Sequence, residues 1–598
     1  MPAPQQEQPA ANKFLAYLGW KKMNTKVARQ NLPDDECAWA ENLQPLAPNL
    51  WQSVNGAAAT LTVVTAKTVT RKFPANIAGI DYDIFFATDG SCTAVNANSG
   101  AQTTVAAAAT FSTTPDMTTY ASQRILIMDP TGGYATWDGT LFVKGGGLSP
   151  NINVTNGGSG YSAAPAVSFT GGSGSGATAT AVMGGSGSAQ FVVAVTLTSP
   201  GSGYKAGDAI TVVFTGSNTT VATATARIWP ITSGITLDVF AGRVWWASAN
   251  AQGNYRILNF TGTAGYDDTN TANAAGSTTV LDNDLSHNIT GIRNKNNFLY
   301  IFGDSSVRQI GSITVSSSIT LFTPLTLASD IGTTFPMTVQ SYNRLVLFAN
   351  TAGVYGIFGA SIRKISDDLD GIFALADFSL PMSSSLNDVH STVTAGGSIH
   401  CYLLLLRYLD PVQGTRTIIC AYQNDQWWIV SQGNALLAIM AIFLGSTQQW
   451  DTFASSGSDV TQLLQTPGAT VSVLFKSALS SNRAPLLSKR VIRAGVAVTS
   501  GIAQSFLLTA ETENSADGHT LNAAALIIWI NNLGQQVNWQ NNSPAAVTFV
   551  GGGYRFPYTA AQGEGKVIGG TVSGTVSKFA LNAMAFEYVD AAIWGTIP

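Results

Sequence analysis

Few residues in this chain have the types and the spacing that catalysis requires. A glycosidase needs two paired carboxylates, or a tyrosine nucleophile with arginines around it. The run from Gly133 to Trp137 resembles the end of a Ser-x-Asp-x-Gly-x-Thr-Trp turn, but Thr131 stands at the aspartate position. A single partial match does not predict an active site.

Metal-ligand spacing is also missing from the sequence. No His-x-x-x-His or Cys-x-x-Cys pair occurs, and the histidines are isolated from one another. Asp282-Asn283-Asp284 and Asp367 to Gly371 look like calcium loops but lack a glutamate at the twelfth position, so we interpret them as solvated turns. The histidines are His287, His390, His400 and His519.

Two further patterns have a structural explanation as well as a functional one. Glycine-rich runs such as Gly171 to Gly176 are not followed by Lys-Ser/Thr, so they predict no phosphate loop. Trp245-Trp246 and Trp427-Trp428 could stack on sugars, although aromatic pairs of this kind usually pack between β-sheets. The sequence therefore predicts no catalytic, cofactor-binding or metal site, no cofactor, and a protein that is not an enzyme.

Charge limits the partners of the chain. Only 11% of its 598 residues are charged, the net charge is −4, and no basic cluster occurs. Stable nucleic-acid binding needs several phosphate-neutralising side chains, so we expect no stable binding of DNA, although DNA could pass along such a surface. Low charge with many Gly, Ser, Thr and Ala residues suits a large all-β assembly component, and it suits an ordinary secreted β protein equally well.

The chain shows no targeting or membrane segment in its sequence. The N-terminal residues 1–20 have no basic stretch followed by an apolar one, so we do not expect a signal peptide. The longest apolar run, Ala435 to Leu444, is far shorter than the ~20 residues of a spanning helix. Four cysteines make no disulfide framework, and we expect free thiols. Cys401 and Cys420 flank a predicted hairpin turn at Asp410 to Gly414, which leaves open whether they lie close together.

The elements that carry these residues are predicted to be antiparallel meanders. Leu237 to Phe240, Val244 to Ala247 and Tyr255 to Phe260 are β-branched or aromatic runs separated by Gly and Asn. Similar units occur around residues 84, 126, 300 and 347, the last opening with a strand at 337–339. Meanders repeated at about 40 to 55 residues are typical of propeller blades. We expect a β-propeller of six or seven blades.

An insertion interrupts the propeller between Leu148 and Ile228, and it contains its own duplication. Gly158-Ser159-Gly160-Tyr161 recurs at 201–204, and Phe169-Thr170-Gly171 recurs at 214–216. We therefore expect a small duplicated β module, either a structural spacer or a surface that contacts glycan or envelope.

After residue 470 the strands lengthen. In the run from Lys578 to Tyr588, Met584, Phe586 and Tyr588 alternate with small or polar residues, which predicts a half-buried strand. A C-terminal, platform-like β-sandwich that packs with the N-terminal segment is expected. The predicted domains are 1–55 (N-terminal arm and extended segment), 56–147 (first blades), 148–228 (inserted module), 229–470 (remaining blades) and 471–598 (sandwich).

The N-terminal region carries a resemblance to a known family. An early asparagine, a Leu-Pro pair, a short acidic turn at 34–36 that could open a helix, and an Asn-Leu pair follow in order. Arg243 to Ser248 and Arg363 to Asp368 are similar to later elements of the same family. The chain resembles the tail nozzle (tail tubular protein B) of short-tailed bacteriophages. The matching N-terminal positions are Asn24, Leu32, Pro33, Glu36, Asn42 and Leu43.

The resemblance implies a virion protein of the phage tail, assembled in the host cytoplasm. It implies a hexameric homo-oligomeric ring that binds adaptor (head-to-tail connector) proteins and tail fibres or spikes. Genomic DNA would pass through without specific binding, and the ring could contact the host envelope. The alternative is a receptor-binding or glycan-processing propeller of a tail fibre or spike. A secreted bacterial adhesin is a third possibility, against which the N-terminal composition argues.

Overall fold

The fold was analysed in a computed structural model of the chain. It describes residues 11–593, apart from 58–59, 63–66, 113, 264, 280–287, 379–388, 395–399, 433–435, 437, 445–448, 456–458, 465–467, 524–528, 531–535, 538, 541–545 and 548–552. His287 and the Asp282–Asp284 run lie outside the described residues. Where the chain is described, no helix is long and apolar enough to span a membrane.

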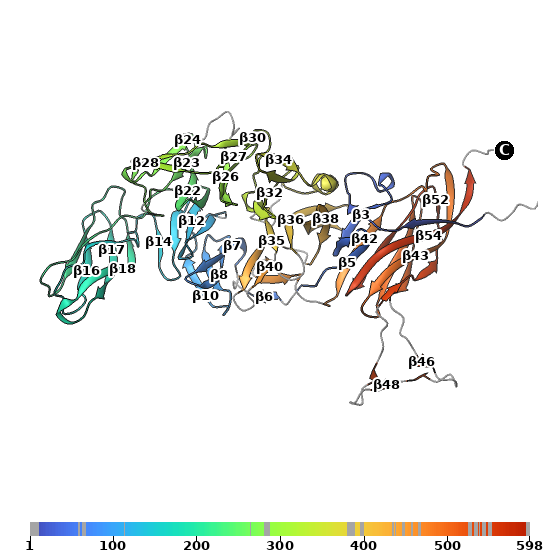
Figure 1. The fold of residues 1–598 in the computed structure, drawn as a ribbon, viewed down its shortest axis with the longest axis horizontal. Helices are drawn as coiled ribbons and strands as arrows, with labels where there is room; N and C mark the ends of the chain where they lie inside the picture. Colours follow the sequence, from blue (N-terminus) through green and yellow to red (C-terminus); the bar gives the residue numbers. More distant parts are fainter. Residues whose placement is uncertain are drawn as a thin grey trace, which may run out of the picture.

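The described strands form seven antiparallel blades in the middle of an elongated molecule (Figure 1). In each blade the strands pair in chain order. Blades 1 to 4 are β7–β10 (Val69–Ile77, Ile80–Ala87, Cys92–Asn96, Gln102–Ala106), β11–β14 (Asp116–Tyr120, Arg124–Asp129, Gly133–Trp137, Phe142–Lys144), β21–β24 (Thr236–Phe240, Arg243–Ser248, Ile257–Phe260, Gly276–Thr279), and β25–β27 with β30 (Ile289–Lys295, Phe298–Gly303, Val307–Ile310, Leu325–Ala328). Blades 5 to 7 are β31–β34 (Gln340–Tyr342, Leu345–Asn350, Gly353–Phe358, Ser361–Lys364), β35–β38 (Ser391–Thr394, Cys401–Asp410, Gly414–Gln423, Gln426–Val430), and β39–β41 (Ala438–Leu444, Gln449–Ser455, Asp459–Leu463).

The first strands of the blades close a circle. β7 contacts β11, β11 contacts β21, and β21 contacts β25. On the other side of the circle, β31 contacts β35, β35 contacts β39, and β39 contacts β7. The 3-10 turn η4 (Pro336–Thr338) contacts both β25 and β35 and so lies between them. The strand predicted at 337–339 is therefore wrong, because Pro336 starts a turn and β31 begins at Gln340. β6 (Thr60–Thr62) completes blade 7 beside β41, so a strand from the N-terminal part closes the ring.

Tight turns set the register of the blades. Two-residue turns with both φ angles positive join the first and second strands of four blades, as type I′ hairpins require. Asn and Gly tolerate this conformation with little strain, which explains the Gly- and Asn-containing breaks seen in the sequence. The turns are Ala78-Gly79, Ala241-Gly242, Asn296-Asn297 and Asn343-Arg344.

The insertion forms one six-stranded sheet at the end of the molecule opposite the C-terminal strands (Figure 1). Its spatial order is β15 (Asn153–Asn156), β20 (Thr223–Thr225), β19 (Thr211–Thr215), β16 (Ala166–Thr170), β17 (Ser175–Gly184) and β18 (Phe191–Ser202). The two repeats pair through β16 and β19, with Ser168 opposite Val213, its own repeat equivalent. The duplication thus builds a pseudo-twofold sheet, and the buried Tyr161 and Tyr204 occupy equivalent places in its core. A bridge between Leu148 and Ile228 joins its two ends.

The C-terminal strands form a sandwich of two sheets. One contains β43 (Leu487–Ser500) and β54 (Phe579–Ile593), flanked by β1 (Lys13–Tyr17), β4 (Leu43–Ala47), β5 (Leu50–Ser53), β50 (Gly553–Arg555), β51 (Tyr558–Ala560) and β52 (Glu564–Gly565). The other contains β42 (Val471–Ser477), β53 (Ile568–Val576), β44 (Ser505–Thr512) and β45 (Ala516–Asn522). Met584, Phe586 and Tyr588 are buried between the sheets, as their alternation predicts.

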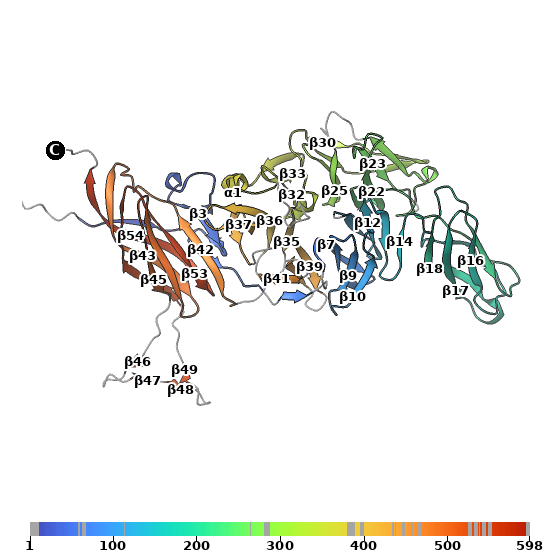
Figure 2. The ribbon, with the colours of Figure 1, turned by 180° about the vertical axis from the view of Figure 1, so that it is seen from behind.

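The N-terminal segment joins the propeller to the sandwich. β3 (Glu36–Glu41) pairs with β38 of blade 6 on one side and with β42 on the other, so one continuous sheet runs through both parts. β2 (Lys22–Met23) pairs with β3. Figure 2 shows β3 between the propeller and the sandwich from behind. The helix predicted at 34–36 is wrong: a 3-10 turn occupies Arg29–Asn31 instead, and Glu36 already belongs to the strand.

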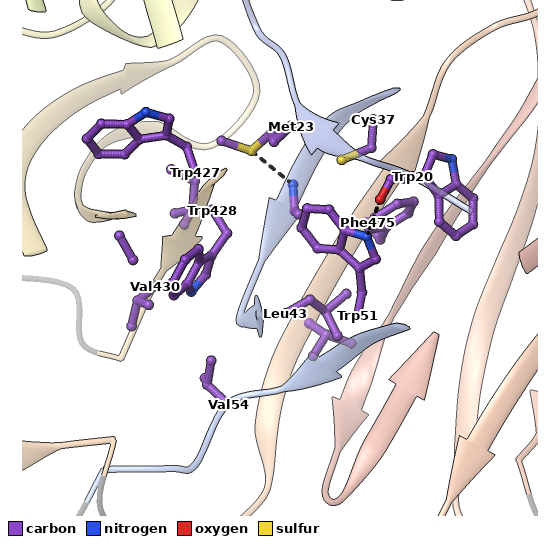
Figure 3. Packing of buried hydrophobic residues seen from close by; sticks show 14 of the residues in the cluster. Trp20, Met23, Cys37, Leu43, Trp51, Val54, Trp427, Trp428, Val430 and Phe475 are labelled. Atoms are coloured by element: carbon purple, nitrogen blue, oxygen red, sulfur yellow. Dashed lines mark hydrogen bonds between the residues drawn. The ribbon is translucent and has the colours of Figure 1, made fainter. Parts of the chain in front are cut away.

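Large aromatic side chains fill this junction (Figure 3). Trp20 and Trp51 both pack edge-on against Phe475, and the indole N–H of Trp51 donates a hydrogen bond to the Trp20 carbonyl at 3.0 Å. Trp428 lies on the blade side of the same cluster and is also buried. Burial of each such ring contributes on the order of 2–3 kcal/mol, so the junction is as firmly packed as a domain core.

Candidate functional site

A cavity of about 610 Å³ lies where the first strands of all seven blades meet. Lining residues come from β7, β11, β21, β25, β35 and β39, and from the η4–β31 segment of blade 5. Since these strands surround the propeller axis, the cavity is the central space of the propeller. Ligand sites in proteins are concave and combine apolar walls with a few converging polar groups, and this space has both.

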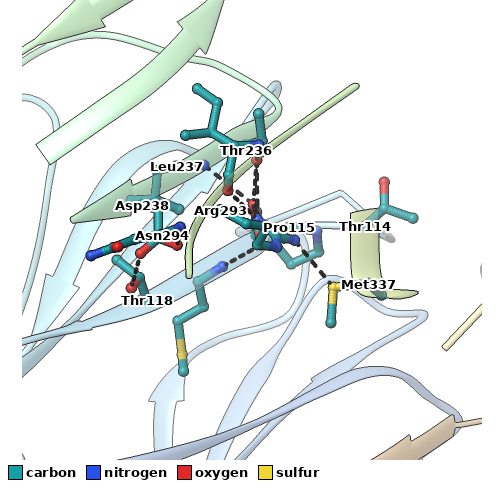
Figure 4. A network of polar contacts seen from close by, with 12 residues as sticks. Thr114, Pro115, Thr118, Thr236, Leu237, Asp238, Arg293, Asn294 and Met337 are labelled. Carbon is teal, nitrogen blue, oxygen red and sulfur yellow. Dashed lines mark hydrogen bonds and ion pairs between the residues drawn. The ribbon is translucent and has the colours of Figure 1, made fainter. Parts of the chain in front are cut away.

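An ion pair between two blades stands at the cavity wall (Figure 4). Arg293 on β25 donates to both carboxylate oxygens of Asp116 on β11, at 2.7 and 3.2 Å. The Asp116 carboxylate also accepts the Thr236 hydroxyl at 2.6 Å, and Arg293 contacts the Met337 sulfur at 3.5 Å. Asp116 is buried, so the bidentate pair satisfies a charge that would otherwise be costly. These contacts bind blades 2, 3 and 4 together.

Among the described residues that line the cavity, Asp238 and Lys295 are charged groups that remain open toward it. The Asp238 carboxylate accepts the Thr118 hydroxyl at 2.9 Å and the backbone N–H of Asn294 at 2.6 Å. Burial raises the pKa of Asp238, whereas these hydrogen-bond donors and the charge of Arg293 lower it by less. Burial likewise lowers the pKa of Lys295, partly opposed by the charge of Asp238. Both residues are half-buried by exposed area.

A second buried pair lies between blades 1 and 7. The Lys72 ammonium is 3.6 Å from the Asp83 carboxylate and lies over the rings of Phe85 and Phe453. Burial lowers the pKa of Lys72 and raises the pKa of Asp83, in each case against the attraction of the partner. The stem of Lys72 lines the cavity while its ammonium points between the blades, so this pair is structural.

The described wall of the cavity carries one carboxylate and several apolar side chains. Asp238 is the sole carboxylate among the residues that line it in the described part of the chain. A glycosidase of the usual kind needs two carboxyl groups about 5–9.5 Å apart. Met117, Met337 and Met440 supply an apolar, adaptable wall. Among the described residues, no group of three His, Cys, Asp or Glu could hold a metal ion.

The residues singled out in the sequence do not gather at this site, except for one histidine. Trp245, Trp246, Trp427 and Trp428 are buried core residues. His390 lines the cavity, His400 stacks on Tyr342, and His519 contacts Asp517 at 2.9 Å. The cysteines of the described chain are free and buried, and Cys420 lies opposite Leu404, not Cys401.

The acidic run at 367–371 is not a solvated turn, contrary to the sequence interpretation. It forms η5 (Asp367–Leu369) and the short α1 (Asp370–Ala374). Asp368 pairs with Lys22 at 2.7 Å, and Asp370 pairs with Lys364 at 2.6 Å. The Asp368 pair could not be seen in the sequence because Lys22 lies 346 residues away, whereas Lys364 is only six residues before Asp370.

Sequence reasoning also missed Asp116, Asp238, Arg293 and Lys295. They are single charges in separate strands, and Asp116 and Arg293 are 177 residues apart. No motif links them. They share one feature, which only the fold reveals: each is a charged residue in the first strand of a blade, the strand that faces the axis.

Comparisons with known proteins give no family. No family model matches, and no curated protein matches. Among solved structures, the chain is similar to PorZ, a bacterial surface component of the type-IX secretion system of Porphyromonas gingivalis. That match has 9% identity and a TM-score of 0.17, and it covers 84% of this chain and 73% of that one. A glycoside hydrolase family 43 arabinoxylan arabinofuranohydrolase from Bacillus subtilis matches with 9% identity and a TM-score of 0.18, covering 88% and 96%. Similarities this weak carry no functional argument.

Proposed function

We propose that this protein is a structural subunit of a phage tail nozzle, a ring that extends a short tail and conducts DNA during ejection. In this role it belongs to the virion, forms a closed ring of about six copies, and binds adaptor proteins on one side and fibres or spikes on the other. It performs no chemistry on the DNA.

The observation that carries the proposal is the role of the residues behind the family resemblance. Asn24 donates to the Glu36 carboxylate at 2.7 Å, which shapes the segment before β3. Asn42 holds the end of blade 6 to β42, and Leu43 is fully buried beside them. A resemblance concentrated in architecture-determining residues supports a shared architecture more strongly than one in surface residues.

Charge supports the same proposal. A channel wall must let a polyanion slide, and rows of lysines would retain it by releasing counterions. The chain has 30 Lys and Arg against 34 Asp and Glu in 598 residues, so neither sign dominates. Many of the described cations are already paired within the subunit. Arg416, for example, donates to both carboxylate oxygens of Glu41, at 2.8 and 3.0 Å.

Electron microscopy of the purified full-length protein tests the proposal. We expect rings with an axial opening wide enough for duplex DNA, alone at high concentration or together with the tail adaptor. A protein that stays monomeric under both conditions, or that assembles without an axial opening, would contradict it.

One observation favours the receptor-binding alternative. The central cavity combines an open cation with one carboxylate and apolar walls, which suits a small ligand. A turnover assay on host polysaccharide separates the alternatives: activity abolished by Asp238→Asn would replace the purely structural role with a glycan-processing one.

A further inference from the structure

The ammonium of Lys295 poses an energetic problem. No described residue lies within hydrogen-bond or ion-pair distance of it, and the nearest opposite charge, Asp238, acts on it only through space. An ammonium in such surroundings is costly unless something pairs with it. Arg293 does not share the problem, since Asp116 binds it at 2.7 Å. Lys295 is therefore the free cation of the described cavity wall.

We propose that the central cavity of the propeller binds a sugar acid, with its carboxylate on Lys295. A charge-assisted hydrogen bond would satisfy the ammonium. Asp238 and Gln340, on blades 3 and 5, retain acceptor capacity for ring hydroxyls after their protein contacts. The methionine wall packs on the apolar face of the ring.

The other charges select this class of anion. Asp238 interacts with Lys295 through space, and it repels a dianion such as phosphate more than a monocarboxylate, which offsets the stronger attraction of the ammonium for a dianion. Arg293, the group best shaped for phosphate, is already occupied by Asp116. The 610 Å³ volume is far larger than acetate needs, and a hexuronate fills part of it with hydroxyls facing polar groups.

The site does not depend on the ring. It uses groups from blades 2, 3, 4, 5 and 7 of one subunit, and none from a second copy. A failure to form rings would therefore not contradict the proposed sugar-acid site, and a failure to bind sugar acids would not contradict the proposed nozzle function.

Calorimetric titration of the full-length protein with D-galacturonate and D-glucuronate tests the site, with galactose, acetate and phosphate as comparison ligands. We expect saturable binding of at least one uronate, and binding roughly tenfold or more weaker for the three comparison ligands. Lys295→Met should weaken uronate binding by roughly tenfold or more, since it keeps the stem and removes the charge. Lys205→Met changes an exposed lysine in a turn of the inserted module; it is the matched control and should bind as the unmodified protein does.

A second variant tests whether Lys295 contacts the ligand or only stabilises the fold. Asp238→Asn removes the opposing charge, so acetate and phosphate should bind more tightly than to the unmodified protein. Circular dichroism verifies the fold of each variant. The proposal is overturned if neither uronate binds saturably, if Lys295→Met binds them unchanged while folded, or if phosphate binds more tightly than both uronates to the unmodified protein.

Discussion

Asn42 offers the sharpest test of how the propeller is held to the sandwich. It is 1% exposed and adopts a left-handed backbone, with φ of 56°. Its side-chain amide donates to the carbonyls of Ser431 at 2.9 Å and Ser472 at 2.7 Å, and its side-chain oxygen accepts the Ser431 N–H at 2.9 Å. One side chain thus links the end of β38 to β42.

The magnitude follows from these contacts. Asn42→Ala removes three hydrogen bonds at about 0.5–1.5 kcal/mol each and adds about 1 kcal/mol for a left-handed alanine. We expect a loss of about 3–5 kcal/mol in the free energy of unfolding of this region. Asn42→Asp keeps the shape but faces two carbonyls with a carboxylate, so it should destabilise strongly at neutral pH and recover in part as acidification lets the carboxyl donate.

Urea unfolding followed by tryptophan fluorescence measures the effect, because Trp51 and Trp428 lie in the same cluster. Amide hydrogen exchange along β3 and β38 locates it. Asn297→Ala is the control: Asn297 is exposed with φ of 64°, so it should lose only the backbone contribution of about 1 kcal/mol. If Asn42→Ala costs no more than Asn297→Ala, the junction does not depend on this residue.

Three further predictions follow from buried groups and from the insertion. Lys72→Met alone should lower the free energy of unfolding by about 3–5 kcal/mol, because it leaves the buried Asp83 carboxylate without its partner. The double variant Lys72→Met/Asp83→Leu should be neutral or stabilising in thermal unfolding. Replacing residues 149–227 by a short Gly-Ser linker should leave the propeller folded, since Leu148 and Ile228 are already bridged; loss of the main unfolding transition would contradict this. Burial raises the pKa of all four thiols, so they should resist a thiol reagent in the native protein, and stability should fall as pH rises above the unfolded thiol value near 9.

The blades were predictable because each is a local pattern. β22, β26 and β32 match runs of aromatic and β-branched residues, and their turns are marked by residues that accept positive φ. The duplicated module was predictable as a repeat. Its pseudo-twofold pairing was not, because strand order depends on which edges meet, and the two repeats could also have stacked side by side.

The central cavity could not be predicted from sequence. Periodicity indicates which strands turn a face toward the core, but not which strand of each blade stands at the axis. Asp116 and Arg293 meet only because seven units close into a circle. The failed helix at 34–36 has a related cause: a strand pairing with β38 and β42 outweighs the weak local preference of three acidic residues.

Continuity of one sheet through the junction limits how the subunit can move. A hinge on the sandwich side of β3 would have to break its pairing with β42, and a hinge on the propeller side would have to break its pairing with β38 and the Arg416–Glu41 pair; either would also disrupt the aromatic cluster. Hinges occur where few packed contacts cross, which is not the case here. The angle between the two parts is therefore a fixed property of each subunit. If copies close into a ring, this angle helps to set the ring geometry, and variants at Asn42 should then change ring order or closure before they abolish folding.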